Sequence, residues 1–178
     1  MGEPLGYQEN LEQRYGGVYD AICELGIPEE HFRTILDPGL RGGKLKHSYR
    51  YFQEHPRLFA PCGEKHVILT SNDLIAQGAI YAIQRSGRRV PEDVAVVGFD
   101  NISAATYAMP SITTVAQDPG LLGEKCFELL MKRILNPSAD CPGEMLPQQI
   151  ALRESAPLAA ENAQLAGLTI FEERVNYP

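Results

Sequence analysis

Residues 66–100 read HVILTSNDLIAQGAIYAIQRSGRRVPEDVAVVGFD, and this stretch decides the fold. It contains two short apolar runs rich in β-branched residues, 67–70 and 94–99, which are typical of strands buried on both faces. Between them, apolar residues recur at helical spacing over 74–85. A strand, a helix and a second strand in this order predict a βαβ unit, so the two strands run parallel in an α/β fold.

Similar patterns extend this unit in both directions along the chain. Helices are predicted over 14–25, 44–54 and 119–135, and strands over 32–36, 112–116 and 149–152. Asp118 is expected to cap the last helix, with Pro119 at its first position, where a missing N–H costs nothing. Residues 156–178 form an Ala-rich tail whose structure the pattern does not indicate. Its apolar segment, 168–171, is too short for a coiled coil.

Composition limits the possible classes of protein. The 178 residues suffice for one ordinary domain, and 44% hydrophobic with 22% charged residues is typical of a soluble globular protein. We find no apolar run of membrane-spanning length and no secretory leader, so we expect a cytoplasmic protein without a membrane partner. The net charge of −7 argues against binding of nucleic acid through its phosphates. The four cysteines form no CxxC pair, so we predict reduced thiols and no metal site.

The polar residues at the ends of the predicted strands are the candidate binding site. Three strands are followed by the pairs Asn72-Asp73, Asp100-Asn101 and Gln117-Asp118. In an open parallel sheet, ligands bind beyond the carboxyl ends of the strands. Carboxylate and amide groups there suit a ligand rich in hydroxyls. Asn72 and Asp118 are open to a second interpretation, in which they serve only as helix caps.

Catalysis has little support in the sequence. There is no GxSxG, no phosphate-binding GxxxxGK[ST] and no GxGxxG after a strand, and none of the four histidines adjoins a plausible nucleophile. We therefore predict no catalytic residue and no cofactor. The weaker alternative is an enzyme that uses Asp73 or Asp100 with a metal ion.

Several sequence blocks, at characteristic intervals, are similar to one known family. They are RYGGV (14–18), AI (21–22), GI (26–27), SNDL (71–74), GA (78–79), RVPEDVAVVGFDN (89–101), PSITTV (110–115), Gln117, LG (122–123) and RES (153–155). Together they resemble the lactose-repressor (LacI/GalR) family of bacterial transcription regulators over about residues 12–155. The central block, 89–101, is very specific.

The resemblance implies a periplasmic-binding-protein-like fold of two α/β lobes with a small effector between them. This chain would supply mainly the C-terminal lobe, a parallel sheet with flanking helices. Residues 1–155 would form a partial effector-binding and dimerisation domain, within which 119–146 would belong to the otherwise missing first lobe, and 156–178 would be a C-terminal tail. The family binds operator DNA through a helix-turn-helix, a module that we expect to be absent from this chain.

The resemblance also assigns roles to individual residues. Arg14, Asn72, Asp100 and Gln117 match effector-contacting positions, with Arg14 on a carboxylate, phosphate or sugar oxygen and the others on hydroxyls. The effector would be a sugar or a sugar-like metabolite. Six residues match regions that make dimer contacts in the family, which implies a homodimer: Leu74, Ile75, Gly78, Ala79, Ile102 and Tyr107. A sugar-binding transport component of the same fold is the alternative.

Overall fold

The structure is a computed structural model that describes residues 7–28, 31–37, 44–61, 65–138, 140, 142–157 and 165–173. Along the chain its elements are α1 (Tyr7–Glu24), β1 (Phe32–Asp37), α2 (Lys44–Glu54), the 3-10 turn η2 (Pro56–Phe59), β2 (Lys65–Thr70), α3 (Asp73–Arg85), β3 (Val94–Asp100), α4 (Ser103–Tyr107), β4 (Thr113–Ala116), α5 (Pro119–Leu135), β5 (Gln149–Ala151) and β6 (Leu165–Glu173).

The strands form one sheet in the order β1-β6-β2-β3-β4-β5. Every neighbouring pair runs parallel except β4 and β5, which run antiparallel. Because β2 and β3 are adjacent and parallel on either side of α3, the predicted βαβ unit is confirmed. The other predicted strands and helices also form, although α1 begins seven residues before its predicted start at Arg14.

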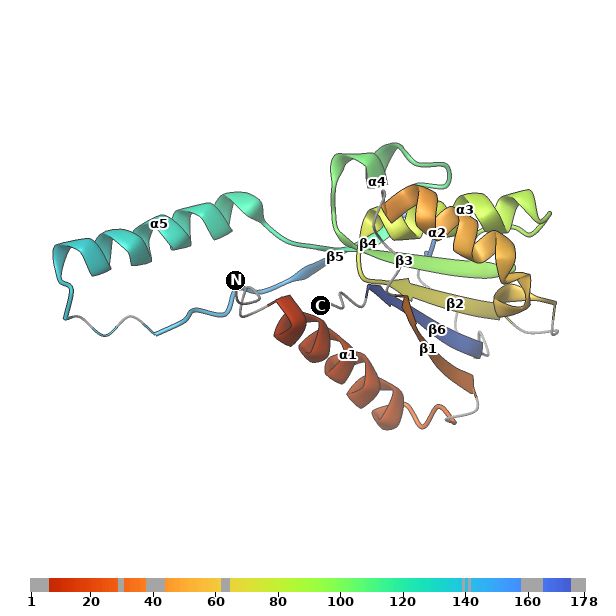
Figure 1. Cartoon of the computed structure of the whole chain (residues 1–178), viewed down its shortest axis with the longest axis horizontal. Helices are drawn as coiled ribbons and strands as arrows, with labels where there is room; N and C mark the ends of the chain where they lie inside the picture. The colour runs from red at the N-terminus through yellow and green to blue at the C-terminus, as the bar shows by residue number, and fades with distance from the viewer. Residues whose placement is uncertain are drawn as a thin grey trace.

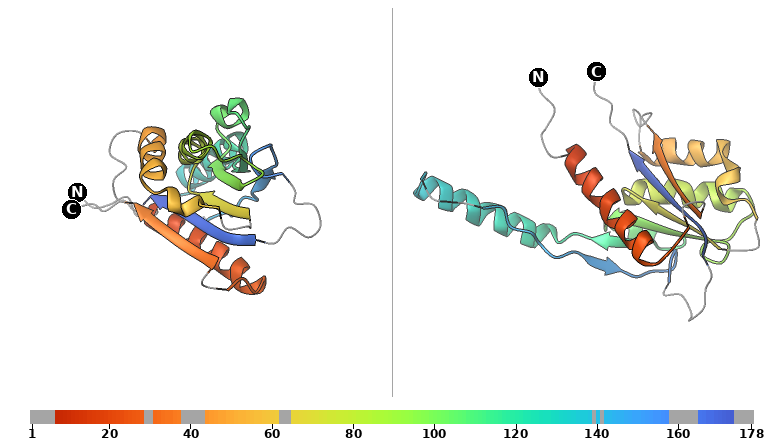
Figure 2. Two further views of the ribbon diagram at one scale, coloured as in Figure 1. Left: turned by 90° about the vertical axis from the view of Figure 1, so that its right-hand side faces the viewer. Right: turned by 90° about the horizontal axis from the view of Figure 1, so that it is seen from below.

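Helices cover both faces of the sheet, as an α/β fold requires. In Figure 1, α2, α3 and α4 lie on one face and α1 lies on the other, and the turned views of Figure 2 agree. The core lies between the sheet and the helices α2 and α3. Its largest fully buried side chains include Phe52, Phe59, Ile68, Ile75, Ile80, Ile83, Val94, Val96 and Ile112.

Two side chains cap the helices that follow β2 and β4. Asn72 Oδ1 accepts a hydrogen bond from the N–H of Ile75 at 3.1 Å. Asp118 Oδ1 accepts one from the N–H of Leu121 at 2.9 Å, and Pro119 follows at the first helical position. Each bond satisfies a main-chain donor that a helix start otherwise leaves without a partner. Asn72 and Asp118 therefore both act as helix caps, as predicted.

The segment after Ser155 contains a strand that sequence analysis did not predict. Residues 165–173 form β6, which lies inside the sheet between β1 and β2. The pattern of alternating residues could not place this strand, because its partners are more than 90 residues away in the sequence.

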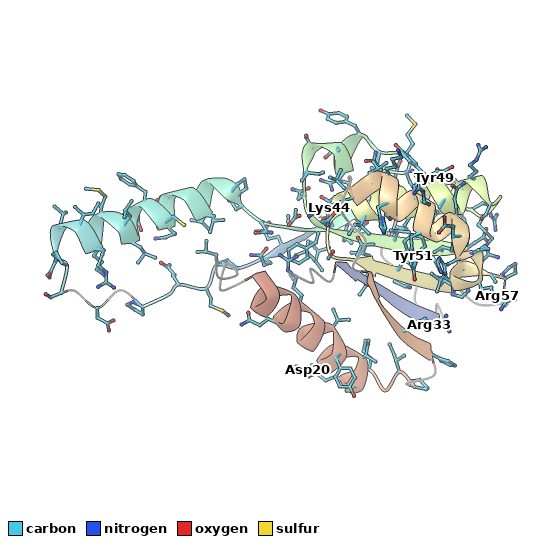
Figure 3. The ribbon with its side chains drawn as sticks, in the orientation of Figure 1. Asp20, Arg33, Lys44, Tyr49, Tyr51 and Arg57 are labelled. Atoms are coloured by element: carbon cyan, nitrogen blue, oxygen red, sulfur yellow. The ribbon has the colours of Figure 1, made fainter. Side chains whose placement is uncertain are left out.

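Helix α5 projects away from the rest of the molecule (Figure 1). None of its side chains is buried, although Phe127, Leu130 and Ile134 are large and apolar, and they remain more than half exposed. In Figure 3 its side chains surround the ribbon without a covering element. Within the described ranges, no helix is both long enough and apolar enough to cross a membrane.

A glycine sets the distance between α2 and α3. A Cβ atom on Gly78 would lie 2.5 Å from the carbonyl oxygen of Leu45 and 2.8 Å from the nitrogen of Tyr49. Beside this crossing, the hydroxyl of Ser48 donates a hydrogen bond to the carbonyl of Ile75 at 2.7 Å. The two helix backbones can therefore pack this closely only when residue 78 has no side chain.

We predict that Gly78→Ala destabilises the chain, because the added methyl group must push α2 away from α3. Overpacking of this kind costs about 1–3 kcal/mol of unfolding free energy. The matched control is Gly17→Ala, since a Cβ there meets no atom within 4 Å in α1. Urea denaturation should show a loss of stability for the first variant and no loss for the second. Equal stability of Gly78→Ala and the unmodified chain would contradict the predicted close contact.

Candidate functional site

The carboxyl ends of β2, β3 and β4 lie side by side at one edge of the sheet, because these strands are neighbours and run parallel. Ser71 and Asn72 follow β2, Asp100 ends β3, and Gln117 follows β4. The structure therefore brings together the three strand ends on which the sequence placed its candidate residues.

Asp100 and Gln117 form a direct pair. The amide nitrogen Nε2 of Gln117 donates a hydrogen bond to Asp100 Oδ1 at 2.8 Å, and both side chains are half-buried. The backbone at Asp100 has φ 98° and that at Asn101 has φ 54°. Residues other than glycine rarely adopt positive φ, and such positions cluster at ligand sites. The strained turn directs the chain abruptly away from the end of β3, beside this polar pair.

Arg14 reaches the same edge from α1, on the opposite face of the sheet from α3. Its Nη1 donates a hydrogen bond to the carbonyl of Ser71 at 3.2 Å. Its guanidinium carbon lies 3.6 Å from the ring centroid of Phe99, within the range of a cation–π contact. Phe99 and the main chain after β2 thus hold a permanent positive charge at the strand ends, where a polar ligand could contact it.

Asn72 contributes less to an open site than the sequence predicted. The residue is only 6% exposed, and its side-chain oxygen Oδ1 accepts the hydrogen bond that caps α3. Only its amide nitrogen remains outside the capping bond. Of the four residues predicted to contact an effector, Arg14, Asp100 and Gln117 are half-buried and Asn72 is buried.

Asp73, considered above as a possible metal ligand, is a structural residue instead. Its side chain is buried, and both carboxylate oxygens are used. Oδ1 accepts a hydrogen bond from the hydroxyl of Thr114 at 2.6 Å, and Oδ2 accepts one from the N–H of Ile102 at 2.8 Å. Gly98 lies against this carboxylate, and a Cβ there would collide with Asp73 Oδ1. Asp73 therefore ties the start of α3 to β4 and to the turn after Asp100.

Arg153 stabilises the other side of that turn, and sequence reasoning assigned it no such role. Its Nη2 donates to Asn101 Oδ1 at 2.6 Å and its Nη1 donates to the carbonyl of Ile112 at 2.7 Å. Ser155 adds a hydroxyl bond to the carbonyl of Val96 at 2.6 Å. The RES block at 153–155 was the available signal for this role, since its polar side chains can form hydrogen bonds that bridge separate strands.

A cavity of about 170 Å³ lies beside the polar pair, between the start of α5 and the chain that returns from it. Gln117 and Asp118 line it, together with Leu121, Leu122 and residues 144 and 146–148. Small-molecule pockets are usually about 300–1,000 Å³. This cavity alone is therefore too small for most ligands, and it contains only one of the predicted effector residues.

The positions predicted to contact a second copy differ in their exposure within one chain. Ile75, Gly78 and Ala79 are buried within this chain, and Gly78 lies against α2. Leu74 and Ile102 are half-buried. Tyr107 is 82% exposed at the end of α4.

The chain matches the family model of the periplasmic binding protein-like domain over residues 3–156. The chain is 34% identical over 147 residues to the HTH-type transcriptional repressor PurR of Mannheimia succiniciproducens. This aligned region covers 81% of this chain and 41% of that protein. It is 38% identical over 88 residues to the ribose operon repressor of Haemophilus influenzae, covering 49% of this chain and 26% of the relative. The chain thus spans less than half the length of these relatives.

Solved structures agree with this likeness. A LacI family transcriptional regulator from Enterococcus faecium with bound ribose has a TM-score of 0.69 and 28% identity, covering 85% of this chain and 53% of that one. The Lac repressor dimer bound to operator and an anti-inducer has a TM-score of 0.52 and 28% identity, covering 64% of this chain and 37% of that one.

The buried carboxylate predicts a pH dependence of stability. Burial raises the pKa of Asp73 above its ordinary value of 3.8, although the bonds from Thr114 and Ile102 lower it. An acid whose pKa is higher in the folded state stabilises the fold below its unfolded pKa and loses that contribution as the pH rises through its folded pKa. We therefore expect the unmodified chain to gain stability relative to Asp73→Asn on acidification.

The measurement is urea denaturation of both chains between about pH 3 and 7. The Asn variant cannot titrate at this position, so the difference between the two unfolding free energies isolates Asp73 from the other carboxylates. A difference between the two unfolding free energies that stays constant over this pH range would contradict the raised pKa of Asp73.

Proposed function

The chain belongs to the LacI/GalR family, of which it matches the C-terminal part of the periplasmic binding protein-like domain, and we propose that it forms one wall of the binding site for a small carbohydrate effector. In this proposal the protein is a cytoplasmic regulator of transcription and not an enzyme. This part of the domain contributes to effector binding, and a separate module contacts operator DNA.

The observation that carries the proposal is the polar cluster at the strand ends. Asp100 and Gln117 are joined by a hydrogen bond of 2.8 Å, and Arg14 lies over Phe99, which precedes Asp100 in β3. Asp100 retains a second carboxylate oxygen, and Arg14 and Gln117 have further N–H donors. Together they provide acceptors for the hydroxyls of a sugar and donors for its oxygens.

The relatives support a sugar as the class of effector. The Enterococcus faecium regulator, the neighbour with a TM-score of 0.69, contains bound ribose, and another neighbour, from Arthrobacter, is a complex with lactose. The curated relatives are named repressors, which favours a regulator over the sugar-binding transport component. An enzymatic role for Asp73 has no support, because Thr114 and Ile102 occupy its carboxylate.

We predict that D-ribose binds the chain with a Kd of about 1 mM, since one wall of a site makes few contacts. Asp100→Ala should weaken binding by at least about tenfold, because hydrogen bonds to charged groups are worth about 1.5–3 kcal/mol. The measurement is an NMR titration of the full chain with ribose, and with lactose as a larger sugar.

Asp20→Ala is the matched control for that titration. Asp20 lies on the exposed side of α1, away from the strand ends (Figure 3), and its loss should leave the affinity unchanged. Equal affinities of Asp100→Ala and the unmodified chain would exclude Asp100 from the site. A chain that binds no sugar at all would exclude the carbohydrate proposal.

We further propose that the chain forms a homodimer through α4 and the exposed side of α3. Large side chains are exposed there, with Tyr107 at 82%, Met109 at 81% and Tyr81 at 39%. Gln84 of α3 donates a hydrogen bond to the carbonyl of Met109 at 3.2 Å, so the two parts form one continuous surface.

The dimer proposal predicts that Tyr107→Asp shifts the chain toward the monomer, because it places a charge where an aromatic side chain would be buried. Removing such an aromatic contact costs at least about 2 kcal/mol at the centre of an interface, or about 30-fold in dissociation constant. Sedimentation velocity over a dilution series measures this shift. Tyr19→Asp, an exposed tyrosine on α1, is the control and should leave the dimer intact.

A further inference from the structure

The segment that contains α2 and η2 differs in charge from the rest of the molecule. The whole chain is acidic, with 16 Lys and Arg residues against 23 Asp and Glu residues. Residues 44–59 reverse this balance, since they contain four of those basic residues, two histidines and a single acidic residue, Glu54. The segment is therefore a local positive region on a negatively charged molecule.

Packing of α2 on the core turns its basic side chains outward. Ser48 and Phe52 are buried, whereas Lys46 and Arg50, one helical turn apart, are exposed. No described helix or strand lies over this outer side of α2 in Figures 1 and 2. Arg57 is exposed just beyond the end of the helix, where Figure 3 labels it. We call the exposed surface formed by Lys46 and Arg50, with Arg57 at its end, the basic face.

The stability of α2 does not explain these charges. Cations stabilise a helix near its C-terminal end, and acidic residues stabilise it near its N-terminal end. In α2 the first turn has Lys46 and no acidic residue, and the last turn has no basic residue. Within the part of the chain that the structure describes, neither Lys46 nor Arg50 forms an ion pair. Their charges are therefore free to bind a partner.

A stacked pair of rings adds apolar surface beside the cations. The ring of His55 lies on that of Tyr51, with centroids 4.2 Å apart and an interplanar angle of 16°. His55 Nδ1 lies 2.8 Å from the carbonyl oxygen of Tyr51, which fixes the orientation of the imidazole. In Figure 3, Tyr51 lies between the two ends of the segment, which Lys44 and Arg57 mark. Flat rings among cations suit a ligand that carries both acidic and apolar side chains.

The spacing of the cations matches an extended peptide. Lys46 and Arg50 are four residues apart, which is about 6 Å along a helix axis. Alternate side chains of an extended strand lie on one face about 6.6 Å apart. A peptide with an acidic residue at every second position can therefore place one carboxylate at each cation. The guanidinium of Arg50 can bind such a carboxylate through two parallel hydrogen bonds.

We propose that the basic face docks an acidic segment of a partner protein, in an extended conformation with Asp or Glu at alternate positions. Charge complementarity favours a short acidic segment over a nucleic acid, because the negative charge of the rest of the molecule repels a polyanion that extends beyond α2. The basic face includes none of the residues proposed to contact the effector, so this inference does not depend on sugar binding.

Fluorescence polarisation of two labelled heptapeptides with the full chain provides the first test. One peptide alternates Glu with Ala, and its matched control alternates Gln with Ala. We expect the Glu peptide to bind at least about tenfold more tightly, and to lose at least about tenfold in affinity between about 0.05 and 0.5 M salt, because salt screens exposed charges. Equal affinities of the two peptides would overturn the proposal.

Charge reversal on α2 locates the binding surface. Lys46→Glu combined with Arg50→Glu should weaken binding of the Glu peptide at least about tenfold, since bonds between charged groups are lost. An acidic residue in the first turn favours a helix, so urea denaturation should show no loss of stability in this variant.

Lys132→Glu combined with Arg133→Glu is the matched control for that variant. It makes the same change in net charge at two exposed positions of α5. The affinity of this control for the Glu peptide should stay within about twofold of that of the unmodified chain. An equal loss of affinity in both double variants would overturn the proposal, because net charge and not the basic face would then govern binding.

Two further measurements distinguish other occupants of the basic face. A labelled single-stranded oligonucleotide of about 20 nucleotides should bind at least about tenfold more weakly than the Glu peptide at about 0.15 M salt. Equal or tighter binding, lost in the α2 double variant, would show a nucleic-acid surface instead. Sedimentation velocity should give the same association state for the α2 double variant and the unmodified chain. Dissociation caused by the α2 substitutions would show that a second copy covers this face, which would also overturn the proposal.

Discussion

The carboxylate of Asp73 joins the start of α3 to β4 and to the turn that follows β3. It begins α3, accepts hydrogen bonds from Thr114 of β4 and from the main chain of Ile102, and lies against Gly98 of β3. A buried carboxylate is costly unless its oxygens are paired, and here both are. The position of Asp100 at the strand ends follows from this arrangement, because its turn is held between Asp73 on one side and Arg153 on the other.

Support from both sides explains how the chain tolerates positive φ at Asp100 and Asn101. Strained backbone persists only where the surrounding contacts hold it in place. Here the contacts come from residues far apart in the sequence, 73, 114 and 153. The candidate effector residues are thus presented by rigid strand ends, and α1 adds Arg14 from the opposite face of the sheet through its contacts with Ser71 and Phe99.

Helix α5 and strand β6 differ in how far the rest of the molecule covers them. Helix α5 exposes apolar side chains such as Phe127 and Ile134, each of which would contribute about 1.5–3 kcal/mol on full burial. It is a surface that needs a covering element. Strand β6, in contrast, already covers two strand edges, and its contribution is through main-chain pairing rather than through a site of its own.

Local pattern was sufficient to predict the βαβ unit, the caps at Asn72 and Asp118, and the strand-end location of Asp100 and Gln117, because periodicity and capping depend on neighbouring residues. It could not predict that Gly78 packs against α2, that both carboxylate oxygens of Asp73 accept hydrogen bonds, or that β6 enters the sheet between β1 and β2. Those features depend on contacts between residues 30 to more than 100 positions apart, such as Gly78 with Leu45 and Thr169 with Arg33. The sequence by itself thus determined the βαβ unit with the helices and strands around it, and which strand ends carry polar groups. Only the tertiary structure decided which of those groups remain accessible, because burial and hydrogen-bond occupancy are properties of packing between distant segments.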